Sequence, residues 1–149
     1  MEKLLYNIIG PEKVTAEIYR SKLKTYQKFS SIFNCPKINR TILEIKSFPV
    51  FLKPDIGQGS KGIYIANDAE EVKFYLKKNK SLLILQFLPG PEYTVDCFSN
   101  RKRNLSFFGA RLRNRIKGGI SVNTFSIVDN EKFKKLANLI NKELILRGA

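Results

Sequence analysis

The feature that most constrains the fold is a glycine-rich segment, residues 57–62, set between two apolar runs too short to form helices. The flanking runs, residues 49–53 and 63–66, are rich in β-branched and aromatic side chains, which is typical of strands. Glycine lets backbone N–H groups turn toward phosphate oxygens, because no side chain stands in the way. The segment therefore predicts either a phosphate-binding loop or a flexible hairpin connection.

Other kinds of glycine loop fit this pattern poorly. Residues 57–62 read Gly-x-Gly-x-x-Gly, but a dinucleotide-binding loop is followed by a helix, and the residues that follow here are strand-like. A Walker A loop ends in Gly-Lys-Ser or Gly-Lys-Thr, whereas this chain has Lys61-Gly62-Ile63. A protein kinase needs a His-Arg-Asp segment, and the chain contains no histidine.

Lys53 is the charged residue in an otherwise apolar strand just before the glycine segment. An ammonium group held in apolar surroundings is costly without a partner, and a polyphosphate would be a natural one. The alternative is a lysine that faces solvent. We expect Lys53 to contact phosphate.

Composition describes a folded and strongly basic chain. The 149 residues are 43% hydrophobic, enough for one domain with a real core, and 27 basic against 13 acidic residues give a formal charge of +14. Such a surface attracts anions, so ATP, nucleic acid and anionic lipid all qualify, and solvated lysines could also account for the excess. Charge alone identifies no partner.

The absence of histidine excludes several kinds of site. Cys35 and Cys97 are far apart and form no CxxC pair, so a zinc or iron–sulfur site is disfavoured and no metal ligand is assigned. Ser-His-Asp and Cys-His catalysis are excluded as well. The apolar run within residues 1–10 is too short for a membrane span and lacks a cleavage site, so we expect a cytoplasmic protein with no membrane partner.

The periodicity of apolar residues predicts an α+β fold of alternating helices and strands. Strands are predicted at residues 41–45, 49–53, 63–66, 82–87, 92–98, 105–113 and 122–128. Helices are predicted after Pro11 with Val14 and Ile18 on the apolar face, from Ser21 as N-cap to Pro36, from Asn67 as N-cap to Lys78, and after Asp129 to a stop near Gly148.

Three segments together resemble the ATP-grasp superfamily, above all its carbamoyl phosphate synthase-like members. Residues 48–54 with 57–63 resemble the strand lysine and the mobile glycine loop of that family. Residues 88–96 resemble the hinge and the strand after it, and residues 21–26 resemble the helix start that carries a second phosphate-binding lysine. The resemblance spans roughly residues 8–149.

The resemblance implies a role for each matching residue. ATP phosphates are expected on Lys22, Lys53, Gly57, Gly59, Ser60 and Gly62. Adenine is expected at Gln86, Phe87 and Leu88, with Gln86 in place of the usual glutamate, and the ribose at Glu92. Arg111 and Arg113 are expected to hold phosphate or acyl-phosphate oxygens and are therefore the predicted catalytic residues, with Arg115 on the same side of their strand. The rival interpretation of these arginines is a solvated basic strand or a nucleic-acid contact.

The resemblance also implies what surrounds this chain. Residues 38–88 would form the small nucleotide-lid subdomain and residues 89–149 the start of the larger one. The magnesium-binding carboxylates of the family would lie beyond residue 149, so we expect a fragment that binds ATP weakly and turns over little. The intact parent would be an ATP-dependent ligase that uses ATP and Mg²⁺ to activate a carboxylate or bicarbonate as an acyl phosphate.

Two alternatives stay open at this stage. A basic nucleic-acid-binding module would use residues 101–103 and the Arg111 strand, although it leaves the glycine segment unexplained and is disfavoured. A degenerate ATP-grasp scaffold could serve protein contacts only. The acid substrate, the nucleophile and the oligomeric state, a homo-oligomer included, are not predicted.

Overall fold

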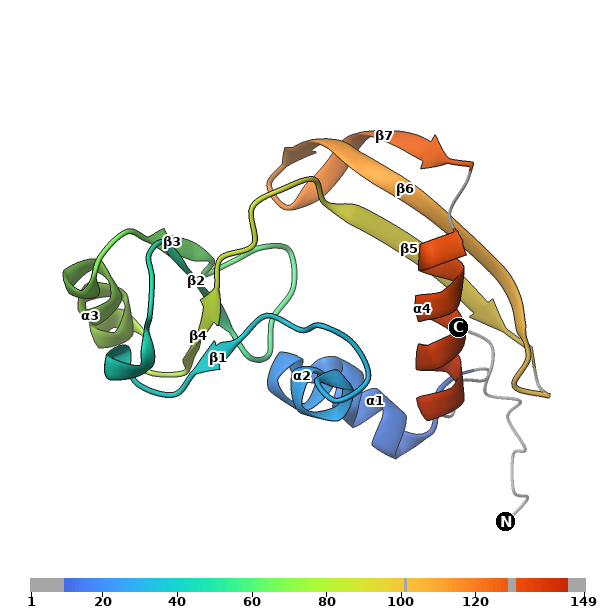
Figure 1. Cartoon of the computed structure of the whole chain (residues 1–149), viewed down its shortest axis with the longest axis horizontal. Helices are drawn as coiled ribbons and strands as arrows, with labels where there is room; N and C mark the ends of the chain where they lie inside the picture. Colours follow the sequence, from blue (N-terminus) through green and yellow to red (C-terminus); the bar gives the residue numbers. More distant parts are fainter. Residues whose placement is uncertain (1–9, 101, 129–130, 145–149) are drawn as a thin grey trace, which may run out of the picture. The chain divides into compact units, whose positions relative to one another are not determined.

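In the computed structural model, residues 10–100, 102–128 and 131–144 are described, and they form two compact units. One unit comprises Met1–Glu17, Glu92–Asn114 and Asn123–Ala149, and the other comprises Ile18–Pro91 and Arg115–Val122. Figure 1 labels the helices and strands of both units. The α+β class expected from the sequence is confirmed, with antiparallel sheets and flanking helices.

The second unit contains a four-stranded antiparallel sheet in the order β1-β4-β2-β3. Its strands are β1 (Ile38–Asn39), β2 (Val50–Pro54), β3 (Tyr64–Ala66) and β4 (Leu82–Gln86). The apolar run at residues 82–85 forms β4, with a neighbour on each side, as its composition predicts. Because β2 and β3 pair directly, the glycine segment lies between two strands as expected.

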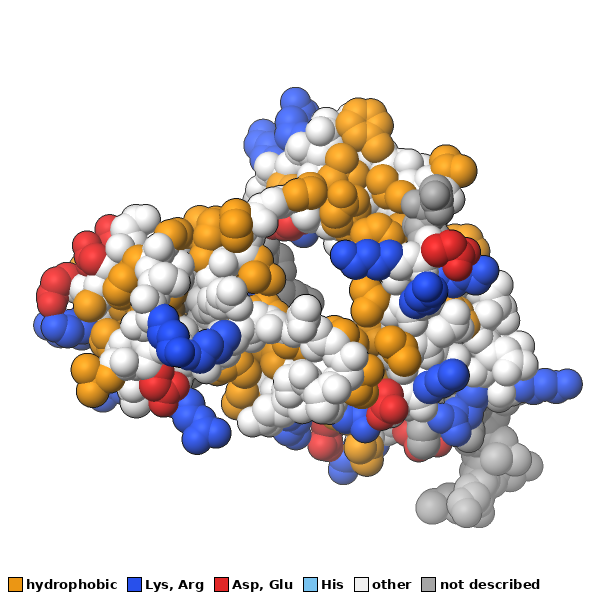
Figure 2. All heavy atoms as spheres, viewed as in Figure 1, with side chains coloured by type: hydrophobic (Ala, Val, Ile, Leu, Met, Phe, Trp, Pro, Cys, Tyr) orange, Lys and Arg blue, Asp and Glu red, His pale blue; other side chains and the backbone are white. Residues whose placement is uncertain are grey.

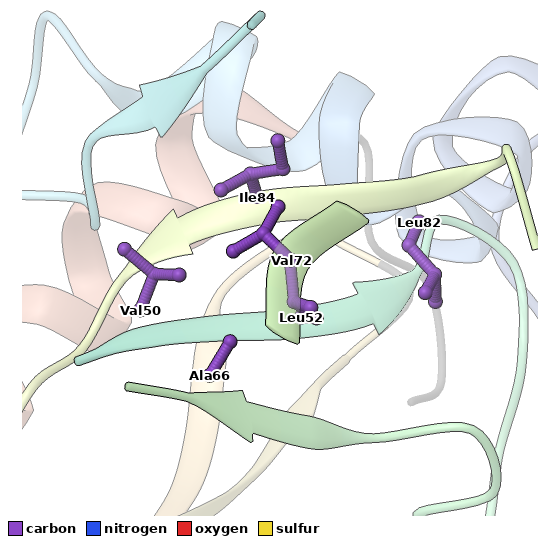
Figure 3. Close-up of a cluster of buried hydrophobic side chains, with 6 residues drawn as sticks. All are labelled: Val50, Leu52, Ala66, Val72, Leu82 and Ile84. Carbon is purple, nitrogen blue, oxygen red and sulfur yellow. The ribbon is translucent and has the colours of Figure 1, made fainter. Parts of the chain in front are cut away.

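One face of this sheet carries the core. Helix α3 (Ala69–Lys78) places Val72 against buried side chains from β2, β3 and β4. Figure 3 shows this cluster, which consists of Val50, Leu52, Ala66, Val72, Leu82 and Ile84. Because successive strand residues alternate between faces, Lys53 points away from the face that α3 covers.

Two short helices precede the sheet, α1 (Lys13–Arg20) and α2 (Lys22–Phe29). The predicted N-cap of α2 is confirmed, because the Ser21 hydroxyl oxygen accepts a hydrogen bond from the Lys24 N–H at 3.0 Å. The predicted apolar face of α1 is wrong: Val14 is 68% exposed, and Thr15 is the buried residue at 3%. Consecutive residues lie about 100° apart around a helix, so Val14 does not share the buried side on which Thr15 lies.

The first unit contains the helix α4 (Glu131–Glu143) and most of a three-stranded sheet in the order β5-β6-β7, whose β6–β7 end, Arg115–Val122, belongs to the second unit. Its strands are β5 (Tyr93–Ser99), β6 (Leu105–Lys117) and β7 (Ile120–Ile127). Helix α4 contacts β5 through the rings of Tyr93 and Phe133, 5.0 Å apart, and through a buried 2.6 Å hydrogen bond from the Ser99 hydroxyl to Asn141 Oδ1. Asp129 and Gly148, expected at the helix ends, lie outside the described residues.

Residues 41–45 do not form the predicted strand. Ile42–Glu44 is instead a 3₁₀ turn, and the short strand β1 takes the place beside β4. The cause is local, because the Glu44 carboxylate accepts a hydrogen bond from the Arg40 N–H at 2.8 Å and folds the segment back on itself.

Two predicted helix boundaries also differ from the structure. Helix α2 ends at Phe29, well before Pro36. Asp68, rather than Asn67, caps α3 by accepting from the Glu71 N–H at 2.8 Å, and the Glu71 carboxylate accepts from the Asn67 N–H at 2.7 Å. The N-cap therefore lies one residue further along than expected, and the Glu71 carboxylate reaches the N–H of Asn67 rather than that of the cap.

Candidate functional site

The glycine segment forms the loop between β2 and β3, in the second unit. Gly59 and Gly62 adopt positive φ values of 65° and 71°, and Ser60 between them has φ 53°. The left-handed region suits glycine and is uncommon for serine. The glycines at positions 59 and 62 thus allow the sharp backbone turns that let a loop direct its N–H groups toward a phosphate.

Lys53 lies on the sheet face opposite the core, and its ammonium group contacts helix α2. Its Nζ donates a hydrogen bond to the Tyr26 hydroxyl at 2.8 Å and lies 5.3 Å from the centre of the Tyr26 ring. The Phe51 ring centre is 5.6 Å away. Lys53 is half-buried, and its partners in the structure are a neutral hydroxyl and two aromatic faces rather than a carboxylate.

Lys22, the first residue of α2, connects this helix to the glycine loop. Its Nζ donates to the carbonyl oxygens of Asp55 at 3.0 Å and Gly57 at 3.2 Å, and its backbone N–H donates to the Asp55 carbonyl at 3.2 Å. The side chain therefore holds the base of the loop against the start of the helix.

The two lysines and the glycine loop surround one small cavity of about 50 Å³. Its lining residues are Lys22, Lys53, Pro54, Gly57, Gln58, Ser60, Lys61 and Ile63. Three lysines and no acidic residue line it, so the cavity favours an anion. Of the predicted phosphate contacts, the structure brings together Lys22, Lys53, Gly57 and Ser60, while Gly59 and Gly62 belong to the same loop without lining the cavity.

Asp55 is a structurally important residue that the sequence did not identify. Its carboxylate accepts hydrogen bonds from the Ser21 hydroxyl at 2.9 Å and from the Leu23 N–H at 2.7 Å. A carboxylate at a helix N-terminus satisfies free N–H groups and complements the helix dipole. No sequence pattern reveals this contact, because the partners are more than 30 residues apart.

The turn between β6 and β7 packs against the glycine loop within the second unit. Gly119 has φ 79°, and a Cβ built on it would collide with the Ser60 side chain and approach the Gly59 backbone. A side chain at this position would therefore displace the loop. The sequence analysis did not identify this contact, because Gly119 and residues 59–60 lie far apart in the chain.

The predicted adenine residues lie at and just after the end of β4, and they do not line the lysine cavity. The Gln86 side-chain oxygen accepts from the Lys37 N–H at 3.3 Å, and the Gln86 N–H donates to the Lys37 carbonyl at 2.8 Å. The carboxamide oxygen expected to meet adenine is thus already engaged, although it retains a second lone pair. Phe87 is half-buried and Leu88 is 58% exposed.

The remaining predicted residues lie in the first unit, where they form ion pairs across β5 and β6. Arg113 contacts Glu92 at 2.8 Å, and Arg111 contacts Asp96 at 3.2 Å. These pairs are largely exposed, so each contributes little to stability. The carboxylate predicted to bind ribose and the arginine predicted to bind phosphate therefore neutralise each other here. Arg115, expected beside them, is exposed in the second unit.

The environment of both cysteines disfavours the thiolate form. Burial raises the pKa of the Cys35 thiol, and burial followed by the charge of Asp96 raises the pKa of the Cys97 thiol. Among the described residues, no group of three or more His, Cys, Asp or Glu side chains could hold a metal ion. Within the same residues, no helix has the length and apolar character needed to cross a bilayer.

Comparison with known proteins is consistent with this loop and sheet. The chain is 34% identical over 87 residues to D-alanine--D-alanine ligase of Fusobacterium nucleatum and 30% identical over 97 residues to that of Petrotoga mobilis. These matches cover 58% and 60% of the chain, but only 30% and 32% of the two ligases. The chain thus spans about a third of the length of these relatives.

Solved structures agree on the fold. The biotin carboxylase domain of Hydrogenobacter thermophilus 2-oxoglutarate carboxylase, crystallised with MgADP, ADP and bicarbonate, matches with a TM-score of 0.70 at 17% identity, over 90% of this chain and 35% of that one. D-alanine-D-alanine ligase of Helicobacter pylori matches with a TM-score of 0.61 at 12% identity, over 91% and 48%. At such identities the likeness concerns the fold alone.

The family match covers most of the sequence. The ATP-grasp domain family matches residues 19–148, which include the two lysines, the glycine loop and both sheets. The chain belongs to the ATP-grasp family.

Proposed function

We propose that this chain supplies the ATP-binding part of an ATP-dependent ligase that activates a carboxylate or bicarbonate as an acyl phosphate. The observation that carries the proposal is the cavity under the glycine loop, lined by Lys22, Lys53 and Lys61 and by no acidic residue. Like charges gathered around a small space repel one another unless an anion joins them. The names of the curated relatives, both ligases, support the reaction class.

In this proposal Lys53 and Lys22 bind the phosphates of ATP. Lys53 exchanges its hydrogen bond to Tyr26 for a charge-assisted one to a phosphate oxygen, and loop N–H groups around Ser60 add further donors. A cavity of about 50 Å³ has room for a phosphate group but not for a nucleotide. In this proposal the cavity therefore receives a phosphate group, while the adenine and ribose lie outside it.

The other roles follow the family pattern. Phe87 and Leu88 contact the adenine ring, with Gln86 on its edge, and Glu92 accepts from the ribose hydroxyls. Arg111 and Arg113 would stabilise the charge that develops on the transferred phosphoryl group, once their carboxylate partners release them. Within this assignment, residues 38–88 are the nucleotide lid and residues 89–149 the start of the larger subdomain.

Magnesium is implied by the family but finds no cluster of ligands in the part of the chain that the structure describes. The lysines of the cavity neutralise part of the phosphate charge, and the substrate is a carboxylate or bicarbonate.

The test is the affinity of the chain for ATP, measured by calorimetry with wild type and the variant Lys53→Met. Loss of one charge-assisted hydrogen bond to phosphate should weaken ATP binding roughly tenfold to hundredfold. Lys78→Met is the matched control, because Lys78 also lies over an aromatic ring, that of Phe74 at 4.1 Å, but does not line the cavity. Equal affinity in wild type and Lys53→Met would refute the assignment.

A selectivity measurement separates this site from nonspecific attraction to a basic surface. ATP should bind more tightly than GTP at fixed salt, whereas binding to single-stranded RNA should weaken steeply as salt rises. On the face drawn in Figure 2, Lys and Arg side chains lie at several places, with Asp and Glu side chains beside some of them.

A further inference from the structure

Tyr26 holds the Lys53 ammonium group, although Tyr26 itself does not line the lysine cavity. Its hydroxyl accepts the 2.8 Å hydrogen bond from Lys53 Nζ, and the centre of its ring lies 5.3 Å from the same atom. Lys53 lines the lysine cavity, whereas Tyr26 lines a neighbouring cavity of about 290 Å³. Tyr26 can therefore influence an anion in the lysine cavity by acting through Lys53.

Helix α2 fixes the place of Tyr26 relative to the glycine loop. Tyr26 lies one helical turn after Lys22, so the two side chains project from the same side of the helix. The Lys22 ammonium donates to the carbonyl oxygens of Asp55 and Gly57, and the Asp55 carboxylate accepts from a backbone N–H in the first turn of the helix. The Tyr26 hydroxyl is thus presented to Lys53 by a helix that is anchored at the base of the loop.

The chemistry of this partner determines how strongly Lys53 is held. In the part of the chain that the structure describes, the Lys53 ammonium and the Tyr26 hydroxyl make no other hydrogen bond. A phenol hydroxyl is neutral, so it holds an ammonium group less strongly than an anion such as phosphate does. A carboxylate in its place would form an ion pair with Lys53 and compete with phosphate far more strongly. The neutral hydroxyl is therefore a partner that phosphate can displace.

We propose that Tyr26 is the positioning residue that sets the affinity of the lysine cavity for phosphate. In the empty site its hydroxyl holds the Lys53 ammonium, and this bond is given up when Lys53 donates to phosphate instead. The affinity for ATP is lowered by the free energy of breaking that bond, whereas the contact with the aromatic ring does not depend on the hydroxyl. The inference rests on the proposed function and adds a residue that controls it without contacting the ligand.

The test compares the ATP affinity of wild type, Tyr26→Phe, Lys53→Met and the double variant by calorimetry. Tyr26→Phe keeps the ring and removes the hydroxyl, so it should tighten ATP binding about threefold to tenfold. A hydroxyl with a merely structural role would give unchanged or weaker binding when removed. In the Lys53→Met background the same change should have no effect, because the residue through which Tyr26 acts is gone.

Tyr75→Phe is the matched control for the loss of a tyrosine hydroxyl. Tyr75 is also half-buried on a helix of the second unit, but its ring stacks on that of Tyr64 at 4.1 Å and it does not line the lysine cavity. Tyr75→Phe should leave the affinity for ATP unchanged.

An NMR measurement follows the Lys53 side chain directly. The ε-methylene signals of Lys53 are identified by their absence from the spectrum of Lys53→Met. They should report a more mobile side chain in Tyr26→Phe than in wild type, because the hydrogen bond that holds the ammonium group is lost. ATP should shift these signals in both proteins.

The outcomes distinguish this inference from the proposed function. If Lys53→Met weakens ATP binding while Tyr26→Phe leaves it unchanged or weakens it, Lys53 binds phosphate but Tyr26 does not set the affinity, and the inference is wrong. If Lys53→Met leaves ATP binding unchanged, the proposed function and the inference both fail. Tighter binding in Tyr26→Phe that persists in the double variant would also overturn the inference, because the hydroxyl would then act independently of Lys53.

Discussion

Replacing Asp55 by alanine tests how the start of α2, and with it Lys22, is held in place. The carboxylate is half-buried and accepts from the Ser21 hydroxyl at 2.9 Å and from the Leu23 N–H at 2.7 Å. Asp55→Ala removes both acceptors and leaves the Leu23 N–H without its partner. It also removes negative charge from a helix N-terminus, where negative charge is favourable.

The expected loss of stability is large for the replacement of a single loop residue. A hydrogen bond to a charged group is worth about 1.5–3 kcal/mol, but part of this is recovered by water at a half-buried site. We expect Asp55→Ala to lower the free energy of unfolding by about 2–4 kcal/mol, which is a substantial share of the stability of an ordinary domain. With an ordinary urea dependence, the midpoint should fall by about 1–2 M.

The assay is urea unfolding followed by circular dichroism, with a double-mutant cycle to Ser21→Ala. Since one hydroxyl bonds to one carboxylate, the two losses should be less than additive by roughly 0.5–2 kcal/mol. Asp68→Ala removes the cap of α3, whose hydrogen bond is exposed, and should cost clearly less. Additive effects, or a loss no greater than that of Asp68→Ala, would refute the view that Asp55 organises this helix start.

Further predictions concern the glycine pair and the cysteines. Gly119→Ala should destabilise the second unit and weaken ATP binding, because the new Cβ displaces Ser60. Gly118→Ala is the control: its φ of 57° is similar but its Cβ would meet open space, so it should cost only backbone strain. Equal effects of the two variants in unfolding and binding assays would count against the loop contact. Because the pKa values of Cys35 and Cys97 are raised, less thiolate is present at pH 8, and iodoacetamide should label both more slowly in the folded chain than in urea, with rates that rise as pH is increased. Labelling in the folded chain as fast as in urea would contradict this.

Several elements of the fold could be predicted because their signals are local. The apolar run that forms β4 and the strand that carries Lys53 need only their own composition to be recognised, and Ser21 was identified as a cap from its position before an amphipathic helix. Three glycines, at positions 57, 59 and 62 between two predicted strands, identified the loop. Each of these features is decided within about ten residues of sequence.

The contacts that were missed join residues far apart in the chain. Asp55 with Ser21 and Gln86 with Lys37 depend on the assembled sheet and helices, and neither pair is marked by composition. Residues 41–45 have the composition of a strand, but β1, and not this segment, pairs with β4, about 45 residues further along the chain. Tertiary contacts, rather than local propensity, therefore set the details of the site.

The structure also changes the reason for assigning Lys53 to phosphate. An ammonium in an apolar strand is costly without a partner, yet Lys53 is half-buried, donates to the Tyr26 hydroxyl and lies over the rings of Tyr26 and Phe51. Burial alone therefore does not demand phosphate. The stronger reason is the arrangement around the cavity, where Lys22, Lys53 and Lys61 meet while Asp55, the nearest acidic residue in sequence, directs its carboxylate to the start of α2 instead. Lysines that served only solubility would not need to lie around one space, where their like charges repel one another, with the available carboxylate directed away from it.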